Sequence, residues 1–105
     1  MSDRLADLEA AVKEFNRRRR WDPAAKDLAI SVAIEAAELM EHFQWTSSPN
    51  DAYDPIRLEV ADIMIYLLHF CRVMDIDLCQ AVLDKLAINE RRFPVPDAPG
   101  ETVFE

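Results

Sequence analysis

Glycine is almost missing from this sequence, since Gly100 is the single one among 105 residues. Because glycine readily interrupts or ends regular structure, its scarcity leaves long stretches that suit helices. The six prolines lie at a few borders and in the C-terminal segment, where they mark the ends of such stretches. We therefore expect an all-α fold.

Cysteine and long apolar runs are scarce as well. Cys71 and Cys79 lie in apolar, helical segments without partners at metal-ligand spacing, so we expect both to be buried, reduced thiols. No apolar stretch is long enough to span a bilayer, and the N-terminal MSDRLADLEA lacks the basic-then-apolar layout of a secretory signal. We expect a cytoplasmic protein.

Positive charge is in deficit, because 12 basic residues stand against 20 acidic ones and the formal net charge is -8. This charge repels phosphate backbones and anionic lipids, so neither nucleic acid nor a membrane is expected as a partner. A small anionic ligand is compatible with it if metal cations bridge the two. The length and the 50% hydrophobic content fit one domain with its own core.

Four helices are predicted from capping residues, from prolines suited to a first helical turn and from apolar residues at three- and four-residue spacing. Residues 1–93 are expected to form one helical domain, a four-helix bundle, and residues 94–105 an irregular tail with three prolines. The turn TSSPNDAYD should separate the second helix from the third. The expected helices run from a cap at Ser2 to about Arg20, from a cap at Asp22 with Pro23 to about Trp45, from a cap at Asp54 with Pro55 to about Met74, and from a cap at Asp77 to about Arg92.

The second and third expected helices are apolar nearly all round, which is typical of helices in an interior. Each carries one narrow polar stripe at helical spacing, and the two stripes repeat the same pattern of acids followed by a histidine. The stripe of the second helix consists of Ser31, Glu35, Glu38 and His42, and that of the third consists of Glu59, Asp62, Tyr66 and His69.

A short turn favours antiparallel packing of these two helices, so that the acids of both stripes would converge. Like charges at such spacing repel each other, and more strongly where water is excluded. No lysine or arginine occurs between Lys26 and Arg57 to neutralise them. A divalent cation is the obvious compensating charge, and all-oxygen ligands favour Mg²⁺ or Mn²⁺ over Zn²⁺. The predicted metal ligands are Glu35, Glu38, Glu59 and Asp62.

Two other interpretations of the stripes are open. Each stripe would be an ordinary solvated helix edge if the two faced water, although such faces are usually wider and mix charges of both signs. A di-iron carboxylate site would use Glu-x-x-His, whereas the residues three positions after Glu35 and Glu59 are acids. We interpret His42 and His69 as packing or supporting residues and not as ligands.

Three segments carry a family resemblance: IEAAELMEHFQW, LEVADIMIYLL and DKLAINERRFPV. Together they resemble the MazG-like all-α nucleotide pyrophosphohydrolases, especially the dCTP pyrophosphatase branch, over about Phe15 to Val95. The signatures Glu-x-x-Glu and Glu-x-x-Asp of that family are matched by the four acids named above. The resemblance implies Mg²⁺-dependent hydrolysis of a nucleoside triphosphate between the α and β phosphates, with dCTP or a modified dCTP as the first expected substrate.

The resemblance also implies roles for single residues. Glu38 is the candidate general base, and Glu35 competes with it for that role. Arg17 to Arg20 are better explained as complementing the negative end of the first helix, although one of them could still reach a triphosphate. Where relatives often have glycine between the first two glutamates, this chain has Ala36 and Ala37, which leaves the base preference open. The positions that match substrate contacts of the family are Trp21, Trp45, Tyr66, Lys85, Asn89 and Arg92.

A helix that is apolar all round leaves surplus hydrophobic surface in a small bundle, so we expect a homo-oligomer, with a tetramer favoured over a dimer. Trp21 or Trp45 would then complete the site of a neighbouring subunit. Three alternative functions stay open. The chain could act on dUTP or on a broad range of triphosphates, bind nucleotide or metal as a regulator without turnover, or use its acidic stripes to bind a basic partner.

Overall fold

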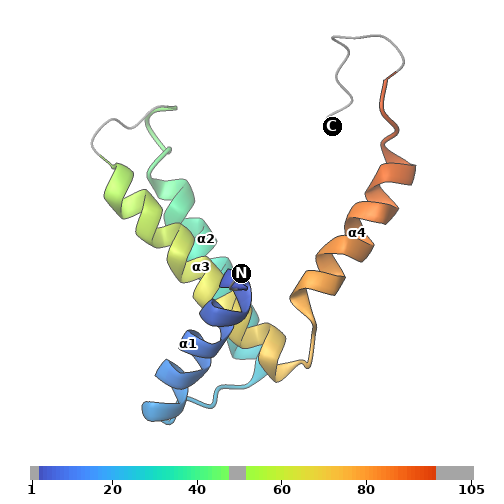
Figure 1. Ribbon diagram of the computed structural model, residues 1–105. Coiled ribbons are helices and arrows are strands. Elements are labelled where there is room, and N and C mark those ends of the chain that lie inside the picture. Colours follow the sequence, from blue (N-terminus) through green and yellow to red (C-terminus); the bar gives the residue numbers. More distant parts are fainter. Residues whose placement is uncertain (1–2, 48–51, 97–105) are drawn as a thin grey trace. The chain divides into compact units, whose positions relative to one another are not determined.

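The computed structural model describes residues 3–47 and 52–96, and within these ranges it contains four α-helices and no strand (Figure 1). The predicted all-α fold with four helices is therefore confirmed. Ser2, residues 48–51 of the expected turn and residues 97–105 of the expected tail lie outside the described ranges. The helices are α1 (Arg4–Arg18), α2 (Ala25–Glu41), α3 (Tyr53–Val73) and α4 (Leu78–Arg92).

The chain divides into two compact units. The first, Met1–Asp75, holds α1, α2 and α3, and the second, Ile76–Glu105, holds α4. In the first unit α2 and α3 lie side by side along much of their length, and α1 packs against α3 (Figure 1). The pair formed by α2 and α3 positions both polar stripes. The expected boundary between a domain and a tail at residue 93 stays a prediction.

Two helix starts follow directly from aspartate side chains. The Asp3 carboxylate accepts a hydrogen bond from the backbone N–H of Ala6 at 3.1 Å, so Asp3 is the N-cap of α1 and the predicted cap at Ser2 was one residue early. The Asp77 carboxylate accepts one from the N–H of Gln80 at 3.1 Å, which confirms the predicted cap of α4. Each cap satisfies a backbone donor that the first helical turn leaves unpaired.

The predicted caps of α2 and α3 were each wrong by two residues. Ala24 is still extended, at φ -69° and ψ 153°, and caps α2 without a side-chain hydrogen bond, so Asp22 and Pro23 belong to the preceding connection. α3 begins before Asp54, with Pro55 as its third residue. Proline fits there because the N–H groups of the first turn have no helical partner. α2 also ends at Glu41, earlier than the predicted Trp45.

The end of α1 is a Schellman motif without glycine. Arg20 has a positive φ of 55°, its N–H donates to the carbonyl of Arg17 at 3.1 Å, and the N–H of Trp21 donates to the carbonyl of Asn16 at 3.0 Å. The Trp21 ring then meets the Phe15 ring edge-to-face, with centroids 5.8 Å apart. This apolar contact is the usual companion of the motif, and it fixes Trp21 beside the end of α1.

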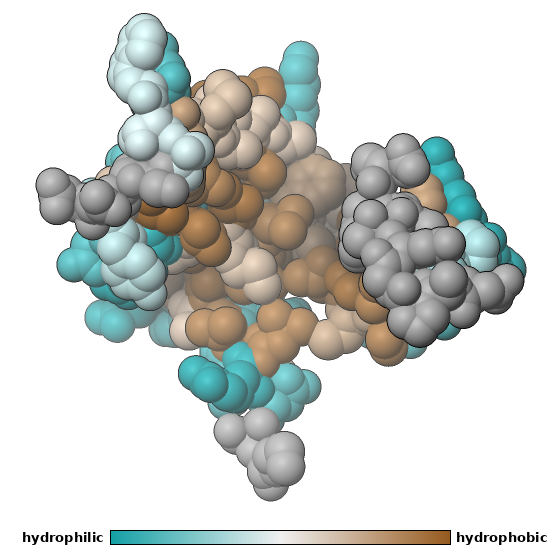
Figure 2. Space-filling model, turned by 90° about the horizontal axis from the view of Figure 1, so that it is seen from above, coloured by the Kyte–Doolittle hydropathy of each residue, from teal (hydrophilic) through white to brown (hydrophobic). Residues whose placement is uncertain are grey.

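Little apolar surface is fully buried within the single chain. Leu28, Leu68 and Cys71 are the buried apolar side chains among the described residues. Many large apolar side chains are exposed instead, and Figure 2 shows them in brown at the surface. Cys71 is buried as predicted, but Cys79 is exposed, because α4 buries none of its residues. No helix in the described part of the chain is long and apolar enough to span a membrane.

Candidate active site

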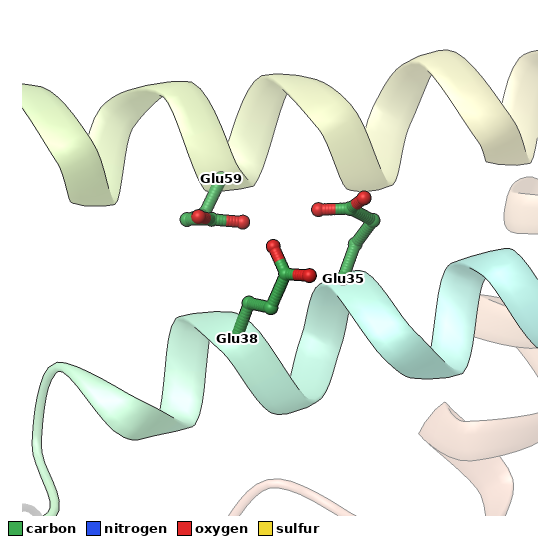
Figure 3. A group of neighbouring side chains, drawn as sticks. All are labelled: Glu35, Glu38 and Glu59. Atoms are coloured by element: carbon green, nitrogen blue, oxygen red, sulfur yellow. The ribbon is translucent and has the colours of Figure 1, made fainter.

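Three glutamates from two helices meet between α2 and α3. Glu35 and Glu38 lie one turn apart on α2, and Glu59 reaches toward them from α3 (Figure 3). One carboxylate oxygen of each lies within 4.8 Å of the others, and all three side chains are half-buried. The structure thus brings together three of the four predicted metal ligands. These three are not on a solvated helix edge, which was the simpler interpretation of the stripes.

The surroundings of Glu35 in this cluster disfavour its charged form. Burial raises its pKa to about 7, and the carboxylate of Glu59 and the negative charges of Glu38 and Asp62 add to the effect. Asp62 itself is exposed, but its charge reaches Glu35. The other three predicted ligands therefore all act on Glu35. The cluster carries more negative charge than its half-buried environment accommodates.

The cluster fits a hard divalent cation. One carboxylate oxygen of Glu35 and one of Glu59 are buried and have no hydrogen-bond partner. Among the described side chains, ion pairs join Arg17 to Glu14 and Arg57 to Asp54, so none neutralises this cluster. Buried, unpaired carboxylate oxygens are costly unless a proton or a cation compensates them. An all-oxygen set of this kind suits Mg²⁺ or Mn²⁺.

The raised pKa of Glu35 predicts a pH-dependent stability of the metal-free protein. The folded state holds the proton of Glu35 up to about pH 7, whereas the unfolded chain releases it near the ordinary value of 4.5. As pH rises between these values the unfolded state loses the proton first, so this site makes folding less favourable. We expect the Tm in the presence of a chelator to fall across this range, and to fall less in Glu35→Gln. An equal slope in the variant would show that Glu35 is not the responsible group.

Asp62, whose charge acts on Glu35, also lines a pocket of about 720 Å³. Its walls come from the end of α1, the connection to α2, the first half of α2 and one face of α3. Three of the predicted site residues, Trp21, Asp62 and Tyr66, lie in this one pocket. The full lining comprises Phe15, Asn16, Arg20, Trp21, Asp22, Pro23, Asp27, Leu28, Ser31, Asp62, Ile65, Tyr66 and His69.

A buried polar pair in the wall of the pocket was missed from the sequence. The side-chain amide of Asn16 donates to Nδ1 of His69 at 3.1 Å, and the two residues are 3% and 4% exposed. Since an amide nitrogen only donates, Nδ1 accepts and the proton of the neutral ring is on Nε2. Burial lowers the pKa of His69, which favours that neutral ring. The pair links α1 to α3, and His69 therefore packs and supports, as interpreted.

Removing the amide of Asn16 is expected to destabilise the fold. In Asn16→Ala the buried Nδ1 of His69 loses its donor, while the backbone carbonyl that holds Trp21 remains. A buried group left without its partner costs about 1–3 kcal/mol. Urea unfolding should therefore show a lower midpoint with an unchanged slope. Glu14→Gln, which removes an exposed ion pair on the same helix, is the control and should change the midpoint little.

The structure does not test the other predicted substrate contacts. Trp45 follows the end of α2, is 89% exposed and does not line the pocket. Lys85, Asn89 and Arg92 lie on α4 in the second unit, where Lys85 and Asn89 are one turn apart. Arg92 lies over the ring of Phe93, with its guanidinium carbon 5.1 Å from the centroid. The substrate roles of these four residues stay predictions.

The fold and the site together define an all-α protein with a carboxylate-rich site between two neighbouring helices. The sequence model of the MazG-like family matches residues 30–102, and the chain belongs to the MazG-like family. It is 34% identical to dCTP pyrophosphatase 1 of Bos taurus over 101 residues, which cover 87% of this chain and 60% of that protein. It is 31% identical to dCTP pyrophosphatase 1 of Homo sapiens over 100 residues, or 86% and 59% of the two chains.

A solved structure agrees with this assignment. The crystal structure of a pyrophosphatase from Archaeoglobus fulgidus superposes with a TM-score of 0.79 at 36% sequence identity, covering 90% of this chain and 96% of that one. The dCTP pyrophosphatases are longer, so this chain spans about three fifths of their length. The residues that the family model matches include all three glutamates of the cluster.

Proposed function

We propose that this protein is a Mg²⁺-dependent nucleoside triphosphate pyrophosphohydrolase that cleaves between the α and β phosphates and releases a monophosphate and pyrophosphate. dCTP or a modified dCTP is the first expected substrate, in a cytoplasmic housecleaning role. The observation that carries the proposal is the half-buried cluster of Glu35, Glu38 and Glu59, in which one buried oxygen of Glu35 and one of Glu59 have no hydrogen-bond partner. A bound cation would compensate their charge, and Asp62, whose charge acts on Glu35, lines a pocket with aromatic walls. Similarity to the dCTP pyrophosphatases supports the choice of substrate.

Glu35, Glu38, Glu59 and Asp62 are the residues that would hold the cation, and Mn²⁺ could replace Mg²⁺. When bound, the ion supplies charge neutralisation for the triphosphate and acidifies water. Burial raises the pKa of Glu35 most, and the positive charge of the ion would offset both this burial and the negative charges of Glu38 and Asp62. For this reason we take the raised pKa as a sign of a cation site and not as proof of a general base.

The remaining roles belong to side chains of the pocket. Trp21 offers a flat face on which any nucleobase can stack, and Phe15 holds that ring in place. Tyr66 lies one turn beyond Asp62 and reaches sugar or phosphate from the same wall. Glu38 accepts the proton of the attacking water, with Glu35 as the competing assignment. A Gln variant that keeps its metal affinity but loses turnover identifies the base.

Product analysis tests the reaction directly. The purified protein is incubated with Mg²⁺ and each common or 5-modified deoxynucleoside triphosphate, and the products are separated. Monophosphate plus pyrophosphate is the expected result, with the fastest turnover on dCTP or its modified forms. Diphosphate plus phosphate would refute the cleavage position, and a preference for dUTP or no preference would move the substrate to that alternative. Tight binding without any product would favour a nucleotide-binding regulator.

We also propose that the working unit is a homo-oligomer, with a tetramer favoured over a dimer. Support comes from apolar side chains on α2 that a stable single chain would be expected to cover, such as Ile30, Ile34 and Met40, which are 47%, 51% and 68% exposed. Light scattering coupled to gel filtration should give a multiple of 12.1 kDa. Dilution should lower both Tm and specific activity, because dissociation exposes this surface. A monomer of unchanged activity at every concentration would contradict the proposal.

A further inference from the structure

Four consecutive arginines, Arg17 to Arg20, lie in the last turn of α1 and directly after it, and their side chains make different contacts. Arg17 pairs with Glu14 at 2.7 Å. Arg19 lies 3.5 Å from the centroid of the Phe15 ring and donates to the Phe15 carbonyl at 3.2 Å. Arg18 lies in the last turn of α1 and does not line the pocket. Arg20 is the one arginine of the four that does.

The backbone of Arg20 is in a conformation that favours a different residue. Its φ of 55° places it in the left-handed region, at the position of the Schellman motif where glycine is preferred because it has no Cβ. An arginine there is less favourable for folding than glycine would be. Residues held in such conformations occur disproportionately at functional sites. A function of the side chain would explain why arginine and not glycine occupies this position.

The charges around Arg20 suggest that this function is to bind an anion. Among the described residues no hydrogen bond or ion pair holds its guanidinium. The other formally charged side chains of the pocket are Asp22, Asp27 and Asp62, all of them acids. A polyanion that enters this pocket needs positive charge from the protein, and the planar guanidinium matches the geometry of phosphate oxygens.

We propose that Arg20 is a substrate-binding residue whose guanidinium contacts a phosphate of the triphosphate. The proposal rests on the function proposed above. It identifies which of the four consecutive arginines contacts the triphosphate, a choice that the sequence alone left open. Arg20 binds the substrate without taking part in proton transfer. Its loss should therefore raise KM more than it lowers kcat.

Two substitutions at Arg20 separate a binding role from a structural one. Arg20→Gly should raise Tm by several degrees, because glycine relieves the left-handed backbone, and yet lower kcat/KM for the best triphosphate by about tenfold or more. Arg20→Lys keeps the charge and should recover part of that loss. Arg18→Gln, which removes one positive charge from the same run, is the control and should retain wild-type kinetics. A variant Arg20→Gly that is more stable and equally active would overturn the proposal.

Binding measurements test whether Arg20 contacts phosphate, and they do so independently of the proposed hydrolytic activity. Calorimetry with a non-hydrolysable α,β-imido triphosphate and Mg²⁺ should show about tenfold weaker binding to Arg20→Gln than to the wild type, while deoxycytidine should bind both equally. Equal losses for both ligands would assign Arg20 to the base or sugar and overturn the phosphate contact. If the wild type binds the analogue without hydrolysing triphosphates, the proposed activity is wrong, but the comparison with Arg20→Gln still tests the phosphate contact. If the wild type does not bind the analogue, both fail.

Discussion

Glu59→Gln is expected to lower kcat/KM for triphosphate hydrolysis by about a thousandfold or more, because the amide keeps the shape of the side chain but removes the charge that holds the cation. Glu59 is the α3 member of the glutamate cluster, and one of its oxygens is buried without a partner. The variant should fold at least as well as the wild type in the absence of metal, since it removes one negative charge from a half-buried cluster of three acids. Loss of activity and retention of the fold would then appear together.

Glu41→Gln is the matched control for this substitution. Glu41 lies on α2, is exposed and is outside the polar stripe, so the change in net charge is the same while the cluster remains intact. We expect its kinetics to be close to wild type. Steady-state rates for both variants, with Tm measured on the same samples, make the comparison. A Glu59→Gln enzyme that retains most of its activity would show that this cluster is not needed for turnover.

Removal of divalent cations is expected to abolish turnover completely, and added Mg²⁺ or Mn²⁺ should restore it. The same ions should raise Tm, because a ligand that binds only the folded state stabilises it by about 2.7 kcal/mol at a hundredfold excess over its Kd. The rise should be larger above about pH 7 than at pH 5, since the cation competes with the proton on Glu35. The measurement is a Tm titration with each metal at the two pH values.

The variants of the cluster provide the controls for this second prediction. In Glu59→Gln the rise of Tm with Mg²⁺ should be much reduced, whereas in Glu41→Gln it should equal that of the wild type. Full activity in the presence of excess chelator would contradict a metal-dependent reaction. An equal Mg²⁺-induced rise in both variants would place the binding site elsewhere on the acidic surface of the protein.

The helical periodicity of the sequence was sufficient to predict the glutamates of the site. The stripes on α2 and α3 were visible because polar residues at three- and four-residue steps stand out in helices that are otherwise apolar. The structure brings Glu35, Glu38 and Glu59 together, since neighbouring helices turn these stripes toward each other. The exact helix starts were less predictable. Ala24 and Ala52 cap α2 and α3 without side-chain hydrogen bonds. The nearby aspartate-proline pairs therefore predicted the wrong capping residues.

Contacts between distant residues could not be predicted from one sequence. Asn16 is one of several polar residues at the end of α1, and only packing of α1 against α3 reveals that it faces His69. Arg20 is hidden in a run of four arginines, because a positive φ at a residue other than glycine has no sequence signal. Asn16, His69 and Arg20 all line the pocket. The pocket could therefore not be predicted without the packing of α1 on α3 and the backbone conformation that follows α1.

The central claim is that acids from α2 and α3 together hold a divalent cation. A crystal soaked in Mn²⁺ and measured for anomalous scattering tests it most directly. The account predicts an anomalous peak among the carboxylates of Glu35, Glu38, Glu59 and Asp62, with their oxygens directly ligating the ion. Saturating Mn²⁺ that leaves this cluster empty, or that binds only at other acids, would contradict it.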